Sequence, residues 1–141
     1  MIALDHPKLA ALNARRDASP NGPGHFHVLD ADRRVRITLD GETVAESDRA
    51  VALKEVGMTV YDPVYYVPRA DAAMDRLRPV AGKTTHCPIK GDATYFALAG
   101  GSSEWVAWSY EAPLDFSAPI AGLVAFDAAR VVIEVHPSPQ P

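Results

Sequence analysis

The chain has very little cysteine: its 141 residues include one, Cys87. A single thiol excludes an intrachain disulfide, and it excludes a zinc site built from paired Cys-x-x-Cys motifs. Because stabilising disulfides are typical of oxidising compartments, their absence leads us to expect a cytoplasmic protein.

Long apolar runs and an excess of positive charge are also missing. No stretch approaches the roughly 20 apolar residues of a membrane span. Asp5, His6 and Lys8 interrupt the N-terminal segment, which therefore predicts no signal peptide. The formal net charge is -4, whereas nonspecific binding of nucleic acid needs a basic face. We expect neither a membrane nor a nucleic acid among the partners.

Three common functional motifs do not occur. The chain has no Gly-x-x-x-x-Gly-Lys-Ser/Thr loop, no Gly-x-Gly-x-x-Gly after a strand and no Gly-x-Ser-x-Gly elbow. These motifs provide the phosphate-binding loops of nucleotide-binding folds and the nucleophile of α/β-hydrolases. Both classes of protein are therefore poor candidates.

The dominant pattern in the sequence is a series of short strands. Val35, Ile37 and Leu39 alternate with polar residues, as in a half-buried strand. The pair Asp40-Gly41 then predicts a tight turn into a returning strand at residues 43–45. Further strands are expected at residues 50–56, 64–67, 94–99, 105–110, 123–126 and 131–135. Together these strands predict an all-β fold, a small open barrel or sandwich of antiparallel strands.

Helix is expected in only a few short segments. Short helical turns are predicted near residues 71–77 and 114–121 of the β domain, which should span residues 34–136. Residues 1–33 are predicted to form an N-terminal appendage, a short helix followed by a loop rich in proline and glycine. Residues 137–141 would be a C-terminal tail.

The first candidate site is the segment 85–92, which places five kinds of reactive side chain in one short loop. Cys87 lies close in sequence to His86 and Lys90, and nearby positive charge favours a thiolate. Asp92 adds a carboxylate. In the alternative interpretation, Cys87 is a buried apolar residue and Lys90-Gly91-Asp92 is a solvated turn.

The second candidate is Glu55. On a strand, Val51, Leu53 and Glu55 point to the same side, so Glu55 can face the core. Burial would then raise the pKa of this carboxylate toward the range of a general base. Alternatively, the strand ends at this point and Glu55 reaches solvent.

The third candidate is an aromatic and charged set. Trp108 and Tyr110 share one face of their strand, and together with Tyr66, Arg69 and Asp71 they could line a small-molecule pocket. The alternative is ordinary core packing.

Histidine forms the fourth candidate. His25-x-His27 could supply two metal ligands, with His86 or His136 as a third. Nothing in the sequence fixes the distances between these histidines, so we predict no metal site.

At these positions the sequence resembles a known family. The matching blocks are residues 45–47, 53–55, 63–71, 85–95, 107–110 and 124–126, in this order. They resemble the bacterial and fungal family called domain of unknown function 427 (DUF427), over about residues 35–135. The resemblance implies an Mss4-like β-tent fold and no particular activity. Zinc-binding proteins of that fold group use paired Cys-x-x-Cys motifs, which one cysteine does not provide.

The leading functional hypothesis is an enzyme without a cofactor that applies acid–base chemistry to a small polar or anionic metabolite. The predicted catalytic residues are Glu55, Lys90, Asp92 and Cys87. The predicted ligand-binding residues are Tyr66, Arg69, Asp71, His86, Tyr95, Trp108 and Tyr110. The alternatives are a non-catalytic module that binds a ligand or a protein, and a redox sensor based on Cys87. Assembly into a homodimer is left open.

Overall fold

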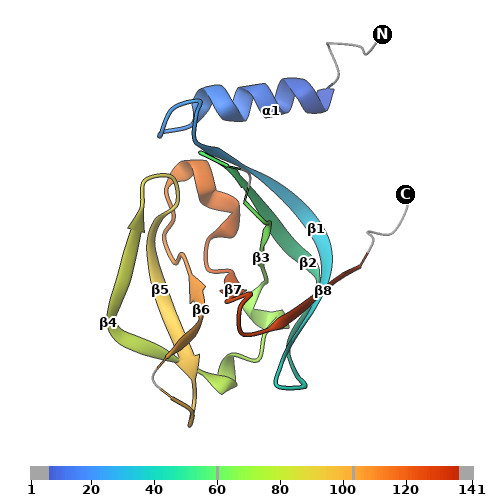
Figure 1. The fold of residues 1–141 in the computed structure, drawn as a ribbon, viewed down its shortest axis with the longest axis vertical. Helices are drawn as coiled ribbons and strands as arrows, with labels where there is room; N and C mark the ends of the chain where they lie inside the picture. The colour runs from blue at the N-terminus through green and yellow to red at the C-terminus, as the bar shows by residue number, and fades with distance from the viewer. Residues whose placement is uncertain (1–6, 60, 103, 137–141) are drawn as a thin grey trace.

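The structure, a computed structural model, describes residues 7–59, 61–102 and 104–136 (Figure 1). Most of these residues belong to β-strands, which form two four-stranded antiparallel sheets. The elements are α1 (Pro7–Ala18), β1 (Phe26–Leu39), β2 (Glu42–Val56), β3 (Val64–Tyr66), η1 (Arg69–Asp71), η2 (Met74–Arg76), β4 (Leu77–Cys87), β5 (Gly91–Leu98), β6 (Trp105–Ser109), η3 (Asp115–Ile120), β7 (Val124–Phe126) and β8 (Val132–His136). The prediction of a small all-β fold is confirmed.

The first sheet has the strand order β3-β2-β1-β8 and is built around the long β1–β2 hairpin. Leu39 pairs with Glu42 across the turn Asp40-Gly41. Both turn residues have positive φ, 51° at Asp40 and 82° at Gly41. This is the geometry of the two-residue turn that the Asp-Gly pair predicts.

The second sheet has the order β4-β5-β6-β7, and it meets the first sheet where β3 approaches β7 (Figure 1). Val67 and Val124 exchange two backbone hydrogen bonds, each with a nitrogen–oxygen distance of 2.8 Å. β3 corresponds to the strand expected at residues 64–67; it is short and lies at the edge of its sheet, between Pro63 and Pro68.

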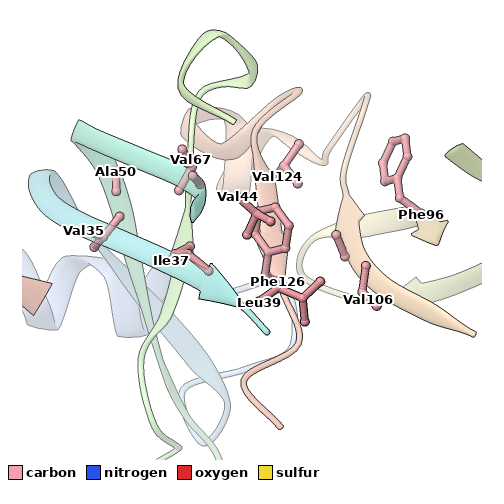
Figure 2. Close-up of a cluster of buried hydrophobic side chains, with 12 residues drawn as sticks. Val35, Ile37, Leu39, Val44, Ala50, Val67, Phe96, Val106, Val124 and Phe126 are labelled. Atoms are coloured by element: carbon pink, nitrogen blue, oxygen red, sulfur yellow. The ribbon is translucent and has the colours of Figure 1, made fainter. Parts of the chain in front are cut away.

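The buried side chains form two cores. Neighbouring residues on one strand contribute to different cores: Ala50 belongs to the first and Val51 to the second, and likewise Val124 and Ala125. Because side chains alternate along a strand, the two cores lie on opposite faces of these strands. The first core (Figure 2) comprises Val35, Ile37, Leu39, Val44, Ala45, Ala50, Val67, Phe96, Val106, Ala107, Val124 and Phe126. The second comprises Val51, Leu53, Tyr66, Ala93, Tyr110, Ile120 and Ala125.

Three parts of the fold differ from the expectation. β4 was not predicted, because most of this edge strand is exposed and it contains Pro79 and Gly82. The strands expected at residues 43–45 and 50–56 are one continuous strand, β2. β1 begins at Phe26, within the segment expected to be an appendage, because Phe26 is buried and pairs with Val56.

The predicted helical segments are short in the structure. Residues 69–76 hold the two single 3-10 turns η1 and η2, and the turn expected near 114–121 is η3. α1 is the one α-helix of the described residues; residues 1–6 of the expected N-terminal appendage and the tail 137–141 lie outside them. None of the helices described is long and apolar enough to cross a membrane.

Candidate functional site

The second core ends in charged groups where β1 begins and β2 ends. Leu29 pairs with Leu53, and His27 pairs with Glu55, so these four side chains share one face of the hairpin. Leu53 is buried, whereas Glu55, next to the last residue of β2, is half-buried. Both interpretations of Glu55 are thus partly right: it follows the core-facing side, and it reaches solvent at the end of the strand.

Glu55 lies between two basic side chains. Its Oε2 is 2.9 Å from Nε2 of His25, and its Oε1 accepts a hydrogen bond of 3.3 Å from Nζ of Lys90. Lys90 belongs to the turn between β4 and β5, and its backbone carbonyl accepts a hydrogen bond from Leu114. The side chains of Lys90 and Glu55 are only 15% and 24% exposed, which makes this the least exposed lysine–carboxylate pair of the described residues.

The protonation of Glu55 differs from the sequence-based prediction. Burial alone would raise its pKa, as predicted. The hydrogen bond from His25 and the positive charge of Lys90 outweigh burial, so the pKa of Glu55 is lowered. Glu55 is therefore ionised at neutral pH and is able to accept a proton.

His27 occupies the centre of a buried hydrogen-bond chain. Its Nδ1 is 3.1 Å from Nη2 of Arg15, and its Nε2 is 2.7 Å from Oγ of Ser117. Ser117 in turn donates a 3.0 Å hydrogen bond to the carbonyl oxygen of Ile89. Because arginine only donates, Nδ1 must accept, and the proton of the neutral ring is therefore on Nε2.

The protonation state of His27 follows from its surroundings. The ring is fully buried. Burial, together with the positive charges of Arg15 and Lys90, lowers the pKa of His27 to about 4, against a smaller opposing effect of Glu55. The imidazole is neutral at pH 7, so the chain runs in one direction, from Arg15 through His27 and Ser117 to Ile89.

This direction excludes a serine–histidine nucleophile at Ser117. Nε2–H of His27 donates a hydrogen bond to Oγ of Ser117, and the hydroxyl of Ser117 donates to the carbonyl of Ile89. His27 therefore does not act as a base toward the hydroxyl of Ser117. This chain of hydrogen bonds instead connects α1, β1, η3 and the turn that carries Lys90, and we call Arg15, His27 and Ser117 the lock. Arg15 strengthens the lock because it donates a 2.9 Å hydrogen bond to the carbonyl of Phe116, and its guanidinium lies 3.6 Å from the centre of the Phe116 ring. Sequence reasoning missed Arg15 and Ser117, since nothing in their spacing links them to His27.

Aromatic side chains cover the same face beside Lys90. Nζ of Lys90 is 5.7 Å from the centre of the Tyr110 ring, and the rings of Tyr110 and Tyr66 are 6.4 Å apart. Trp108 donates a hydrogen bond of 3.2 Å from Nε1 to the hydroxyl of Tyr66. Burial, with smaller effects of Cys87 and Glu55, raises the pKa of both tyrosines, which therefore remain protonated.

Some residues of the predicted aromatic pocket thus belong to the hydrophobic core. Tyr66 and Tyr110 are buried, whereas Trp108, Tyr95 and Cys87 are half-buried and pack against the second core. The hydroxyl of Tyr95 is 2.7 Å from the hydroxyl of Thr85 on β4. The reactivity expected for Cys87 stays a prediction.

The segment 85–92 is divided between two faces of the second sheet. Cys87 and Ala93 face the second core, and alternation directs His86 and Asp92 to the opposite face. There they pair with each other over 2.7 Å, with side chains 66% and 75% exposed. The structure therefore brings Lys90 to Glu55 but leaves His86 and Asp92 on the other side of the sheet.

Arg69 and Asp71 also lie apart from Glu55. Arg69 donates a 2.8 Å hydrogen bond to the carbonyl of Gly122 and forms an ion pair with Glu111. Asp71 accepts a 2.6 Å hydrogen bond from Ser47 and pairs with Arg49. Both side chains connect neighbouring segments of the chain, and the contacts described for them do not include Glu55 or Lys90.

The surface beside His25 is hollowed. Gly24, His25, Gly57, Met58 and Tyr61 line a depression of about 240 Å³. Because His25 contacts Glu55, this depression adjoins the charged end of the second core. Within the described residues, no three His, Cys, Asp or Glu side chains are grouped closely enough to hold a metal ion.

The fold and the site define a small all-β protein with a shielded lysine–glutamate pair at one end of an aromatic face. The chain belongs to the family described as "Domain of unknown function (DUF427)", whose model matches residues 27–136. The resemblance seen in the sequence is therefore confirmed, and the match includes Glu55 and Lys90. A search of curated proteins finds no match.

Proposed function

We propose that this protein is a cytoplasmic enzyme that binds a small organic anion at Lys90 and removes a proton from it with Glu55, without a cofactor. The observation that carries the proposal is the Lys90–Glu55 pair, in which an ammonium and an ionised carboxylate lie 3.3 Å apart and are largely shielded from water. Shielded charges with convergent partners are characteristic of functional sites. The single cysteine supports the cytoplasmic location.

Ligand binding would itself activate Glu55. A carboxylate of the ligand that pairs with Lys90 draws the ammonium away from Glu55. This removes one of the effects that lower the pKa of Glu55, so its burial has more weight and its basicity rises. Glu55 then takes the proton of a C–H bond next to the ligand's carboxylate. The electron pair stays on the ligand as an enolate, which Lys90 stabilises.

Deuterium exchange tests this chemistry without knowledge of the natural substrate. The protein is incubated in D₂O with a mixture of small 2-hydroxy and 2-amino acids, which carry a C–H bond next to the carboxylate, and mass spectrometry detects deuterium bound to carbon. We expect the wild type to exchange at least one compound. Glu55→Gln should slow that exchange at least about 100-fold, the usual contribution of a general base. Asp92→Asn is the matched control, because Asp92 lies on the opposite face, and it should exchange like the wild type.

A non-catalytic binding module is the second candidate. It is favoured by the satisfied state of the interior: among the described residues, no buried side-chain nitrogen or oxygen lacks a hydrogen-bond partner. Binding that depends on Lys90, with no exchange of any compound, would contradict the enzyme and support this module. The Mss4-like β-tent architecture and the redox role of Cys87 stay predictions.

A further inference from the structure

A register shift gives the second sheet an unusual pair of tryptophans. Trp105 and Trp108 are three residues apart, so in a regular strand they would point to opposite faces. Phe96 pairs with Ala107, but the next residue of β5, Ala97, pairs with Trp105. This irregularity is a β-bulge, a device that redirects a side chain and is common next to active sites. Here it brings the ring of Trp105 within 5.9 Å of the ring of Trp108.

Tyr95 completes a row of three rings. It pairs with Trp108 across β5 and β6, and its ring centre is 5.1 Å from that of Trp105. We call Tyr95, Trp105 and Trp108 the ring row. All three side chains are half-buried, in contrast to the buried Tyr66. A row of aromatic surfaces that stays partly open to solvent can receive a flat ligand.

A positive charge, the ammonium of Lys83, lies beside the ring row. Nζ of Lys83, on the edge strand β4, is 4.8 Å from the ring centre of Tyr95 and 5.9 Å from that of Trp105. Lys83 is therefore held over the rings by cation–π attraction. Although the whole chain has a net charge of -4, this surface favours a negative ligand over a positive one.

The ring row and the Lys90–Glu55 pair belong to one face. Trp108 contacts the hydroxyl of Tyr66, Tyr66 lies beside Tyr110, and the ring of Tyr110 lies beside Lys90. Two buried tyrosines thus separate the ring row from Lys90. A ligand that reaches both must be longer than one ring.

We propose that the ligand of this site is an elongated aromatic carboxylate whose planar body lies on the ring row while its carboxylate pairs with Lys90. The carboxylate end rests on the proposed function, and the aromatic body rests on the bulge and on the three partly exposed rings. Lys83 reinforces the preference for an anion along the body.

The chain itself provides the reporter for a test. It contains only two tryptophans, and both belong to the ring row. In NMR spectra of ¹⁵N-labelled protein, both indole N–H signals therefore come from the ring row. The probes are biphenyl-4-carboxylate, its saturated analogue 4-cyclohexylcyclohexanecarboxylate, acetate and the cation 4-phenylbenzylammonium.

We expect biphenyl-4-carboxylate to shift both indole signals and to bind about fivefold or more tightly than the saturated analogue, the scale of an aromatic contact. The cation should bind most weakly of the elongated probes. Trp105→Ala should abolish the advantage of the aromatic probe, and Trp105→Phe should retain most of it. Lys90→Met should weaken both elongated carboxylates by about tenfold, since it removes one charge-assisted contact.

The two proposals fail in different ways. If both elongated carboxylates bind equally and both depend on Lys90, the anion site stands and the aromatic ligand class is wrong. If binding depends on Trp105 but not on Lys90, the ring row stands as a site and the proposed anchor is wrong. If Trp105→Ala unfolds, Trp105→Phe and the indole shifts of the wild type still test the aromatic ligand class. The absence of any indole shift with biphenyl-4-carboxylate overturns the inference.

Discussion

Acidification from pH 7 to pH 5 is expected to cost the protein about 2 kcal/mol of stability through His27 alone. In the folded state, burial lowers the pKa of His27 from its usual value of 6.5 to about 4. Above pH 6.5 the ring is neutral in the folded and the unfolded chain. As the pH falls below 6.5 the unfolded chain takes up a proton that the folded chain does not bind. The loss continues down to about pH 4, where the folded state also becomes protonated.

Chemical denaturation at pH 7, 6 and 5 measures this loss above the range in which most carboxylates titrate. Glu55 has a lowered pKa, so its own stabilising effect is lost only at lower pH, below the usual range of a glutamate. His27→Gln should flatten the dependence, because its amide can accept from Arg15 and donate to Ser117 without titrating. His86→Gln, at an exposed histidine, should keep the wild-type slope. An unchanged slope in His27→Gln would contradict the assigned role of His27.

Ser117→Ala is expected to lower the free energy of unfolding by about 3 kcal/mol, since each unsatisfied buried group costs about 1–3 kcal/mol. The substitution removes one oxygen atom and leaves two buried groups without their partner: Nε2–H of His27 and the carbonyl of Ile89. Ser117 itself is fully buried, so water has no ready access to replace the hydroxyl.

Urea unfolding at pH 7 provides the measurement. Ser102→Ala is the matched control: its hydroxyl is exposed and accepts one bond from Glu104, so the change should stay within about 1 kcal/mol. A loss below about 1 kcal/mol in Ser117→Ala would mean that the chain from Arg15 to Ile89 contributes little to stability. If Ser117→Ala lowers the free energy of unfolding by this much, the backbone NMR signals of Lys90 should also broaden, because Ser117 holds the turn of Lys90 through the neighbouring Ile89.

The sequence predicted the parts of the fold that depend on local signals. Alternation in Val35–Leu39 and the Asp40-Gly41 turn identified the β1–β2 hairpin, and the strands expected at residues 94–99 and 105–110 correspond to β5 and β6. β4 gave no such signal, because an edge strand that is exposed along most of its length lacks an apolar period. Its existence depends on pairing with β5, which is a tertiary property.

The candidate site could be predicted only in part, because local alternation places some of its residues and tertiary contacts place the others. Alternation correctly put Glu55 on the side of Val51 and Leu53. The same alternation separates Asp92 from Cys87, but it becomes usable only when residues 85–87 are known to be a strand and not a loop. The lock formed by Arg15, His27 and Ser117 joins residues more than 100 positions apart, for which a single sequence contains no signal.

The pairing of β8 with β1 has a consequence for how the chain folds. Ile37 pairs with Ile133, so this contact closes a loop that includes most of the protein, whereas the β1–β2 hairpin closes over two residues. Loop closure of this length is costly and slow compared with hairpin formation. Until β8 arrives, β1 presents an open hydrogen-bonding edge next to buried Val35 and Ile37. An open strand edge of this kind can pair with another copy of the protein, so β8 protects the protein from aggregation by covering it.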